Sequence, residues 1–189
     1  MVFVRTDLEG VMAAILRRTL AASIVLLTGA AAPVGAAASP NSKVVTAHDG
    51  LRDLEPDLSG AFDRAHGLAV LVSRGESTSA ILRVRGIERS AAGRSFGAHL
   101  HSGPCVAGDG AAAGPHYNTD TVAGKVPPRV NRSTEVWLDF TVGPSGAANA
   151  MAVVPFTPLP GNRSIVIHEK PTDHHGAAGA RLACLPLSW

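Results

Sequence analysis

The chain has 189 residues, which is enough for one domain with its own hydrophobic core. Apolar residues make up 46% of it but aromatic residues only 4%, so Val, Leu, Ile and Ala must supply that core. The formal net charge is only +2 and the basic residues are scattered, which argues against the basic stripe that nucleic-acid binding requires.

The first 38 residues have the pattern of a secretory signal. Arg17 and Arg18 form a positive region, the apolar run Thr19–Leu27 follows, and small residues with Ala-x-Ala cleavage sites end it around Ala36–Ala38. An uncleaved membrane anchor is the alternative, but the apolar run is short for a span of about 20 residues. We therefore expect cleavage of residues 1–38 and a secreted or cell-envelope, extracytoplasmic location.

This pattern also suggests where the chain starts and where its domain begins. Asp7 and Glu9 are unusual ahead of a signal, which predicts that translation starts at Met12. Residues 39–60 have mixed polarity and no sustained period, so we expect a linker or a first strand there. The remaining residues, 61–189, form the predicted folded domain.

Export changes how the two cysteines of the chain, Cys105 and Cys184, are interpreted. An even pair in an oxidising compartment predicts a disulfide, and a pair of free, reactive thiols is the alternative. A disulfide would close a loop of about 80 residues and contribute on the order of 4 kcal/mol in the chain-entropy model.

Short strands separated by turns dominate the predicted domain. The 20 Gly and 13 Pro favour many turns, and no convincing amphipathic helix is present. Gly75-Glu76 is expected to join two strands as a hairpin. The expected strands are, in chain order, 44–47, 65–74, 77–87, 96–101, 135–142, 147–156, 163–169 and 181–187. This pattern predicts an all-β fold, an eight-stranded Greek-key barrel or immunoglobulin-like sandwich with long loops.

Two histidines one residue apart lie on one of these strands. Side chains at i and i+2 of a strand point to the same face, so His99 and His101 can reach one ion while Leu100 faces a core. Alone, this spacing also fits two solvated or hydrogen-bonded histidines. His116 and His168 raise the total to four imidazoles, which suit copper or zinc better than calcium or magnesium.

Four segments of the chain resemble the copper/zinc superoxide dismutase family. FGAHLHSGPC (96–105), GPHYN (114–118), SIVIHEK (164–170) and GAAGARLAC (176–184) occur in the order and context of that family. The resemblance extends over residues 65–187 and is closest to the secreted bacterial members, because Cys105 follows the paired histidines within a few residues.

The resemblance implies roles for individual residues. It makes Arg181 the arginine that guides the superoxide anion, Cys105 and Cys184 the intrachain disulfide, and His116 the histidine that bridges copper and zinc in two-metal members. From sequence alone, Arg181 could instead be a surface charge on a loop. The implied copper ligands are His99, His101, His116 and His168.

The chain departs from the family where the zinc ligands are expected. Residues 118–142 contain no histidine, although family members with zinc place two further histidines and an aspartate after the bridging one. Glu135 falls near one missing ligand, and Asp139 or Asp120 could replace the aspartate. One histidine and one or two carboxylates make a poor structural zinc site. We therefore expect a copper-only member, with Asp139 as a possible residual zinc ligand.

The loop after His168 is also shorter than the charged loop of the family. Within residues 169–180, Asp173 is expected to accept a hydrogen bond from a metal-bound imidazole. His174 and His175 are expected to be exposed, with metal delivery as an alternative role.

These observations leave three hypotheses for the function. The first is a secreted superoxide dismutase that cycles Cu(II) and Cu(I), converts superoxide to dioxygen and hydrogen peroxide, and has no nucleic-acid partner and no membrane partner after signal cleavage. The second is a non-enzymatic extracellular module that buffers or delivers copper. The third is a structural β-sandwich without metal. A homodimer is compatible with the apolar strands.

Overall fold

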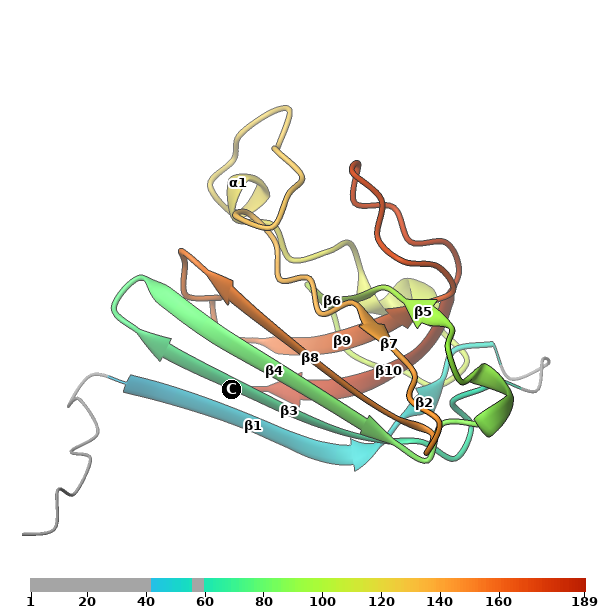
Figure 1. Ribbon diagram of the computed structural model, residues 1–189. Helices are drawn as coiled ribbons and strands as arrows, with labels where there is room; N and C mark the ends of the chain where they lie inside the picture. The colour runs from blue at the N-terminus through green and yellow to red at the C-terminus, as the bar shows by residue number, and fades with distance from the viewer. Residues whose placement is uncertain (1–41, 56–59) are drawn as a thin grey trace, which may run out of the picture. The chain divides into compact units, whose positions relative to one another are not determined.

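The computed structural model of the protein describes residues 42–55 and 60–189, and the predicted signal, residues 1–38, lies outside these ranges. The described chain consists mainly of antiparallel strands (Figure 1). Within the described ranges the helices are short, and none is long and apolar enough to cross a bilayer. They are η1 (Arg89–Ala91), η2 (Gly110–Ala113) and α1 (Thr119–Val122). The strands are β1 (Ser42–Gly50), β2 (Arg52–Asp53), β3 (His66–Arg74), β4 (Ser77–Arg85), β5 (Ser95–Phe96), β6 (Ala98–His101), β7 (Phe140–Thr141), β8 (Ala147–Val154), β9 (Asn162–His168) and β10 (Arg181–Ser188).

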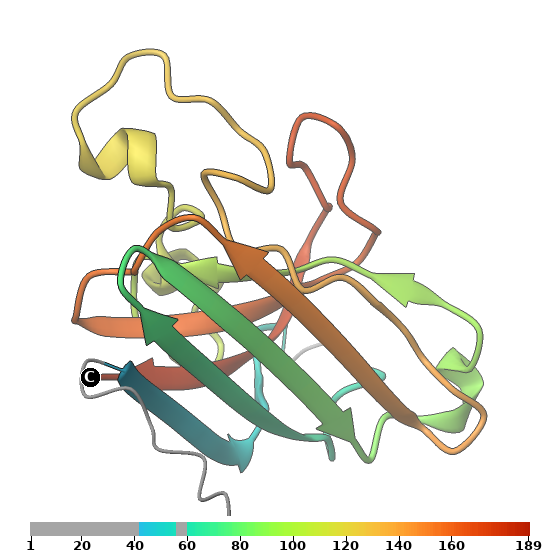
Figure 2. The same ribbon diagram turned by 60° about the vertical axis from the view of Figure 1, so that its left-hand side comes forward.

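The strands form two four-stranded sheets and one small two-stranded sheet. One large sheet has the order β1-β3-β4-β8, the other β2-β10-β9-β6, and β5 pairs with β7. Figures 1 and 2 show the two large sheets stacked as layers. The side chains between the layers form the main core, which includes Leu71, Leu82, Leu100, Ile165 and Leu185. The predicted all-β sandwich is therefore confirmed, although it holds two-residue strands that the sequence pattern did not show.

The alternation of apolar residues sets which side of each strand is buried. In β4, Ala80, Leu82 and Val84 are buried in the core, while the residues between them face outward. The predicted hairpin is confirmed, because Arg74 pairs with Ser77 across Gly75-Glu76. The early strand expected at 44–47 is part of the longer β1, which pairs with β3 over its whole length.

The segment 135–142, predicted as one strand, is regular only at β7. Its backbone changes partner along its length: Glu135 bridges to Asn118, and Leu138 donates its N–H to the carbonyl of Ala98 on β6. A ladder that switches between two neighbours is too interrupted to form a continuous strand. The same segment thereby brings the Glu135 and Trp137 side chains beside β6.

A second, smaller cluster lies on the opposite face of the sheet β2-β10-β9-β6 from the main core. It contains the predicted disulfide between Cys105 and Cys184, whose sulfur atoms are 2.04 Å apart. Leu54, Ala113 and Val166 pack around it. The disulfide thus ties β10 to the loop that follows β6, on the face where the histidines also lie.

Candidate metal centre

The four histidines singled out in the sequence converge at one site. Each offers one ring nitrogen, and these four nitrogens lie within 4.8 Å of one another. His99 and His101 leave β6 on the side away from the main core, because Leu100 between them belongs to it. His168 ends the neighbouring strand β9. His99, His101 and His168 are buried, and His116 is partly exposed.

His116 comes from the loop after β6, which turns back onto its own strand. His116 forms an isolated antiparallel bridge with His101, and Gly103 donates its N–H to the carbonyl of Ala113. Gly114 has φ +66°, and a Cβ atom there would lie 2.7 Å from the Ser102 hydroxyl oxygen. The return is therefore tight enough that only glycine fits at this position.

Hydrogen bonds from the chain fix the tautomers of His101 and His168. Their Nδ1 atoms lie 3.0 Å from the carbonyl of Gly114 and 3.3 Å from that of Gly179. A carbonyl oxygen only accepts, so both Nδ1 atoms carry the proton. In the neutral rings the two Nε2 lone pairs then face each other at 3.2 Å. A metal cation between them would replace this repulsion with two bonds.

His99 is oriented by a side-chain relay. The Thr172 hydroxyl donates its proton to Oδ1 of Asp139, so it accepts a hydrogen bond at 2.7 Å from Nε2 of His99. This leaves Nδ1 of His99 unprotonated. That atom is buried and has no hydrogen-bond partner. An orphaned buried acceptor aimed at three other lone pairs fits a metal ligand, and it is the observation on which the metal assignment rests.

His116 is held by Glu135. Its Nδ1 donates to Oε2 of Glu135 at 3.0 Å, which leaves Nε2 as the free nitrogen. Glu135 also accepts hydrogen bonds from Nε1 of Trp137 at 2.8 Å and from the Asn118 amide at 2.9 Å. Burial raises the pKa of this carboxyl, but the hydrogen bonds from His116, Trp137 and Asn118 outweigh it, so the pKa of Glu135 lies below its ordinary value.

Burial keeps the buried rings neutral. It is the largest cause that lowers the pKa of His101 to about 2 and that of His168 to about 4. It also lowers the pKa of His99, with help from the neighbouring imidazoles. These rings are therefore unprotonated at neutral pH, which is the state that binds a metal.

Arg181 supplies a positive charge beside the site. Arg181 is the first residue of β10 and pairs with His168 on β9. Its guanidinium donates a hydrogen bond to the carbonyl of Gly110. After burial, its charge is one of the further causes that lower the pKa of both His101 and His168. The structure thus brings the predicted arginine next to the predicted histidines, three residues before the disulfide at Cys184.

The carboxylates considered for zinc are engaged elsewhere. Asp139 accepts hydrogen bonds from Thr172 and pairs with Arg132 at 3.2 Å, and Asp120 pairs with Lys125 and Arg129, both at 2.7 Å. Within the described ranges, the four histidines are the only group of three or more His, Cys, Asp and Glu residues placed to hold a metal. The residues present therefore do not fit a second, zinc-type site.

In the loop after β9, a different residue from the expected one contacts a histidine of the site. Asp173, expected to orient a metal-bound imidazole, instead accepts backbone N–H bonds from His175 and Ala177. The neighbouring Thr172 takes the expected role, and a single threonine in a polar loop carries no signal that would have revealed it. His174 and His175 are exposed, as expected, with ring centroids 3.8 Å apart.

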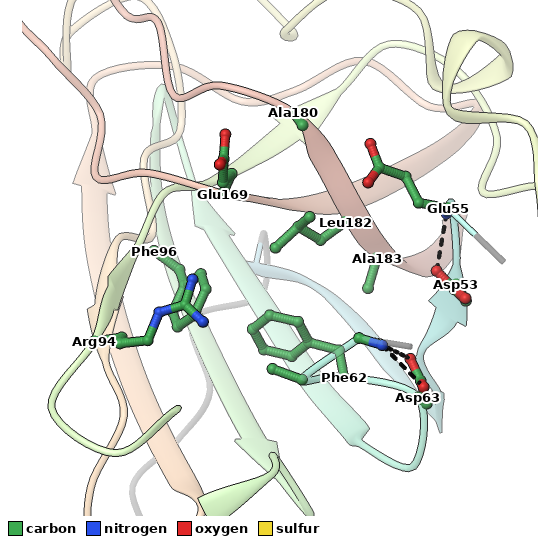
Figure 3. A pocket seen from close by; sticks show the side chains of 12 residues that line it. Asp53, Glu55, Phe62, Asp63, Arg94, Phe96, Glu169, Ala180, Leu182 and Ala183 are labelled. Carbon is green, nitrogen blue, oxygen red and sulfur yellow. Dashed lines mark hydrogen bonds between the residues drawn. The ribbon is translucent and has the colours of Figure 1, made fainter. Parts of the chain in front are cut away.

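A cavity of about 320 Å³ lies apart from the histidines, between residues 60–63 and the start of β10 (Figure 3). Phe62, Phe96 and Leu182 line it, with carboxylates at its rim. Asp53 and Asp63 accept hydrogen bonds from the backbone N–H groups of Glu55 and Gly60 (Figure 3). These two carboxylates therefore stabilise local turns.

Comparisons with known proteins bear on the family and the fold of the chain. The family model of copper/zinc superoxide dismutase matches residues 65–185. The crystal structure of the clock protein EA4 matches with a TM-score of 0.52 and 16% identity, over 80% of this chain and 96% of that one. A double mutant of a SOD-like protein from Bacillus subtilis matches with a TM-score of 0.52 and 21% identity, over 75% of this chain and 97% of that one.

At these identities the two structures show a shared fold alone. No curated protein matches the chain. The family model covers well over half of the sequence, including all four histidines, Arg181 and both cysteines. The chain belongs to the copper/zinc superoxide dismutase family.

Proposed function

We propose that this chain is a copper-dependent superoxide dismutase of the copper-only type. One observation carries the proposal: one nitrogen from each of four imidazoles converges within 4.8 Å of the others, and Arg181 lies opposite one of these histidines, His168. Imidazole donors suit copper and zinc. When bound, copper supplies one-electron chemistry between Cu(II) and Cu(I), which zinc lacks, and which the conversion of two superoxide anions and two protons to dioxygen and hydrogen peroxide requires.

The four histidines would bind the ion through different ring nitrogens. His99 would bind through its orphaned Nδ1, and His101, His116 and His168 would bind through Nε2. Because Glu135 accepts the Nδ1 proton of His116, that nitrogen does not face a second cation. In two-metal members of the family, the corresponding nitrogen binds zinc. In this chain Nδ1 of His116 instead keeps its proton and donates it to the Glu135 carboxylate.

Arg181 is proposed to bind the superoxide anion. The Gly110 carbonyl holds its guanidinium, and the Cys105–Cys184 disulfide anchors the strand that carries it. A cation that is already in place needs no reorganisation when the anion arrives. Positive charge at the site also raises the rate at which a small anion is captured.

Export from the cytoplasm is part of the proposal. The disulfide between Cys105 and Cys184 supports it, because such bonds form and persist in oxidising compartments. The signal pattern of residues 1–38 supports it independently.

The test combines metal analysis with kinetics. The full chain is refolded with copper and zinc together, its metal content is measured, and the decay of superoxide is followed. We expect one copper and no zinc per chain, fast decay, and a strong loss of rate in R181A that R181K partly restores. R94A is the matched control, because it removes an exposed guanidinium that lies over Phe96.

Each other outcome supports a different hypothesis. Tightly bound copper without turnover would sink the dismutase proposal and support copper buffering. A chain that folds but binds no metal would support the third hypothesis, a structural β-sandwich without metal.

A further inference from the structure

The outer face of the sheet β1-β3-β4-β8 has a composition that the metal centre does not explain. Alternate residues of each strand point into the core, and the others point outward. Within these four strands, which the structure describes in full, no outward position holds Asp or Glu; the one carboxylate, Asp49, is exposed near the end of β1 but alternates to the core side and accepts the N–H of Gly50. The outward positions do hold five basic residues: His48, His66, Arg74, Arg83 and Arg85.

Apolar side chains fill the middle of this face. Val44 on one edge strand is 61% exposed, and Met151 and Val153 on the other are 70% and 62% exposed. These three residues mark an apolar band that runs across the full width of the sheet, and Figures 1 and 2 show this sheet as an outer layer. Two neighbouring rows of cross-strand partners make the band: Val44, Val72, Ser79 and Val153, then Thr46, Val70, Ile81 and Met151.

A cavity of about 190 Å³ lies at one end of the band. Two histidines, two arginines and Leu68 line it, on strands β1, β3 and β4. One water takes up only about 30 Å³ of liquid volume, so the cavity has room for a larger group such as a phosphate. Arg83 and Arg85 are exposed, and guanidinium groups bind phosphate oxygens with paired, charge-assisted hydrogen bonds. A cavity lined by basic side chains therefore adjoins an apolar surface.

We propose that this face docks on a bilayer that contains anionic phospholipids, with a lipid phosphate in the cavity and the apolar band in the interfacial region. A bilayer offers both chemistries together over a broad surface. This proposal departs from the expectation, drawn from the sequence, that the chain has no membrane partner after signal cleavage. The docking face is a separate feature, visible only once the pairing of the four strands is known.

Charge and shape disfavour two other partners. A second copy packed face to face would place cations opposite cations, with no carboxylate on either face to pair with them. An acidic peptide added as a strand would pair with the edge of β1 or β8, and one bound by arginines would contact only the end of the face where Arg83 and Arg85 lie. The band instead extends over the whole width of the sheet, from Val44 on β1 to Val153 on β8.

The experiment measures sedimentation of the full chain with phosphatidylcholine vesicles that contain or lack phosphatidylglycerol. We expect binding that depends on phosphatidylglycerol and weakens with salt. Each basic side chain near an anionic surface changes the affinity about fivefold, so R83Q/R85Q should bind about 30-fold more weakly. M151S/V153S should also bind severalfold more weakly, because it removes apolar contact while the charge is kept.

The matched control is R94Q/K170Q, which removes two exposed cations from other loops and gives the same net charge as R83Q/R85Q. Thermal unfolding shows that each variant is folded, and copper content shows that its metal site is intact. Equal losses in the two double variants, or no dependence on phosphatidylglycerol, would overturn the proposal.

Two further arms distinguish other ligands of the same face. Release by inorganic phosphate at millimolar concentration would make the cavity a site for free phosphate. Release by polyglutamate, or self-association that M151S/V153S abolishes, would assign the face to an acidic protein or to a second copy. Either result rejects the bilayer. None of these readouts depends on dismutase activity.

Discussion

The Thr172 hydroxyl oxygen lies 2.7 Å from Nε2 of His99 and donates its own proton to Asp139. One side chain of a short loop thereby determines which nitrogen of a buried histidine is free. Metal-binding histidines commonly donate their second N–H to such an acceptor, and this contact tunes the affinity.

Replacing Thr172 with valine should release the His99 ring. The isosteric T172V variant lacks an acceptor for the Nε2 proton, so the metal-free protein should populate both tautomers of His99. The measurement is ¹⁵N chemical shifts of the imidazole, and copper affinity should fall about 10- to 100-fold. T172S keeps the hydroxyl and should behave as the wild type. An unchanged tautomer in T172V would show that the relay is not what fixes the ring.

Removing the Glu135 carboxylate should destabilise the fold. E135A leaves the donors of His116, Trp137 and Asn118 without their partner; those of Trp137 and Asn118 are buried, and each unsatisfied buried donor costs about 1–3 kcal/mol. We expect a loss of about 3 kcal/mol or more in the free energy of unfolding, measured with urea on metal-free protein. E76A, in an exposed turn, should change it by less than about 0.5 kcal/mol. Equal effects of the two variants would contradict this account of Glu135.

The metal-free protein should lose stability in mild acid. The folded pKa of His168, about 4, lies below its unfolded value of 6.5, so the folded state favours the neutral ring. This contribution is fully present above pH 6.5. It is lost as the pH falls from 6.5 towards 4, because the unfolded chain takes up the proton first.

For His168 alone the loss is on the order of 3 kcal/mol. Urea unfolding across this pH range measures it, and H168N should make the dependence shallower without abolishing it, because burial lowers the pKa of His99 and His101 as well. A wild-type stability that stays constant from pH 7 to pH 4 would refute this linkage.

Leu100 connects the core to the metal centre. It is 1% exposed and lies between the two histidines of β6, so L100A should cost about 2–5 kcal/mol and weaken copper binding as well. L159A is the matched control, since Leu159 is 52% exposed and should be tolerated. Urea unfolding and a copper titration follow the two effects. A large loss of stability with unchanged copper affinity would mean that β6 positions its histidines without this contact.

Strand periodicity and paired cysteines were enough to predict the sandwich and the disulfide. The side-chain period of two also predicted that His99 and His101 share a face, while Leu100 enters the core. These are local properties of each strand. They could be predicted because the apolar residues of a strand decide which of its two sides is buried.

The contacts that orient the ligands were not predictable in the same way. Thr172 and Asp139 are 33 residues apart and meet only through the packing of two loops. Asp173 was the more plausible acceptor by residue type, but it caps its own turn. The segment 135–142 had the composition of a strand, yet its backbone pairs first with Asn118 and then with β6. This arrangement places Glu135 and Trp137 beside the histidines.

The two sheets of the sandwich keep the metal centre, which must attract an anion, apart from the face proposed to bind negatively charged lipid. Stacked sheets are about 10 Å apart, and physiological salt screens a charged surface over about 8 Å. The histidines lie on the outer side of the sheet β2-β10-β9-β6, and the docking face lies on the outer side of the other sheet. A chain adsorbed on anionic lipid would therefore hold its metal centre beyond the reach of the membrane's negative potential, where an approaching anion meets Arg181 before it meets the lipid charge.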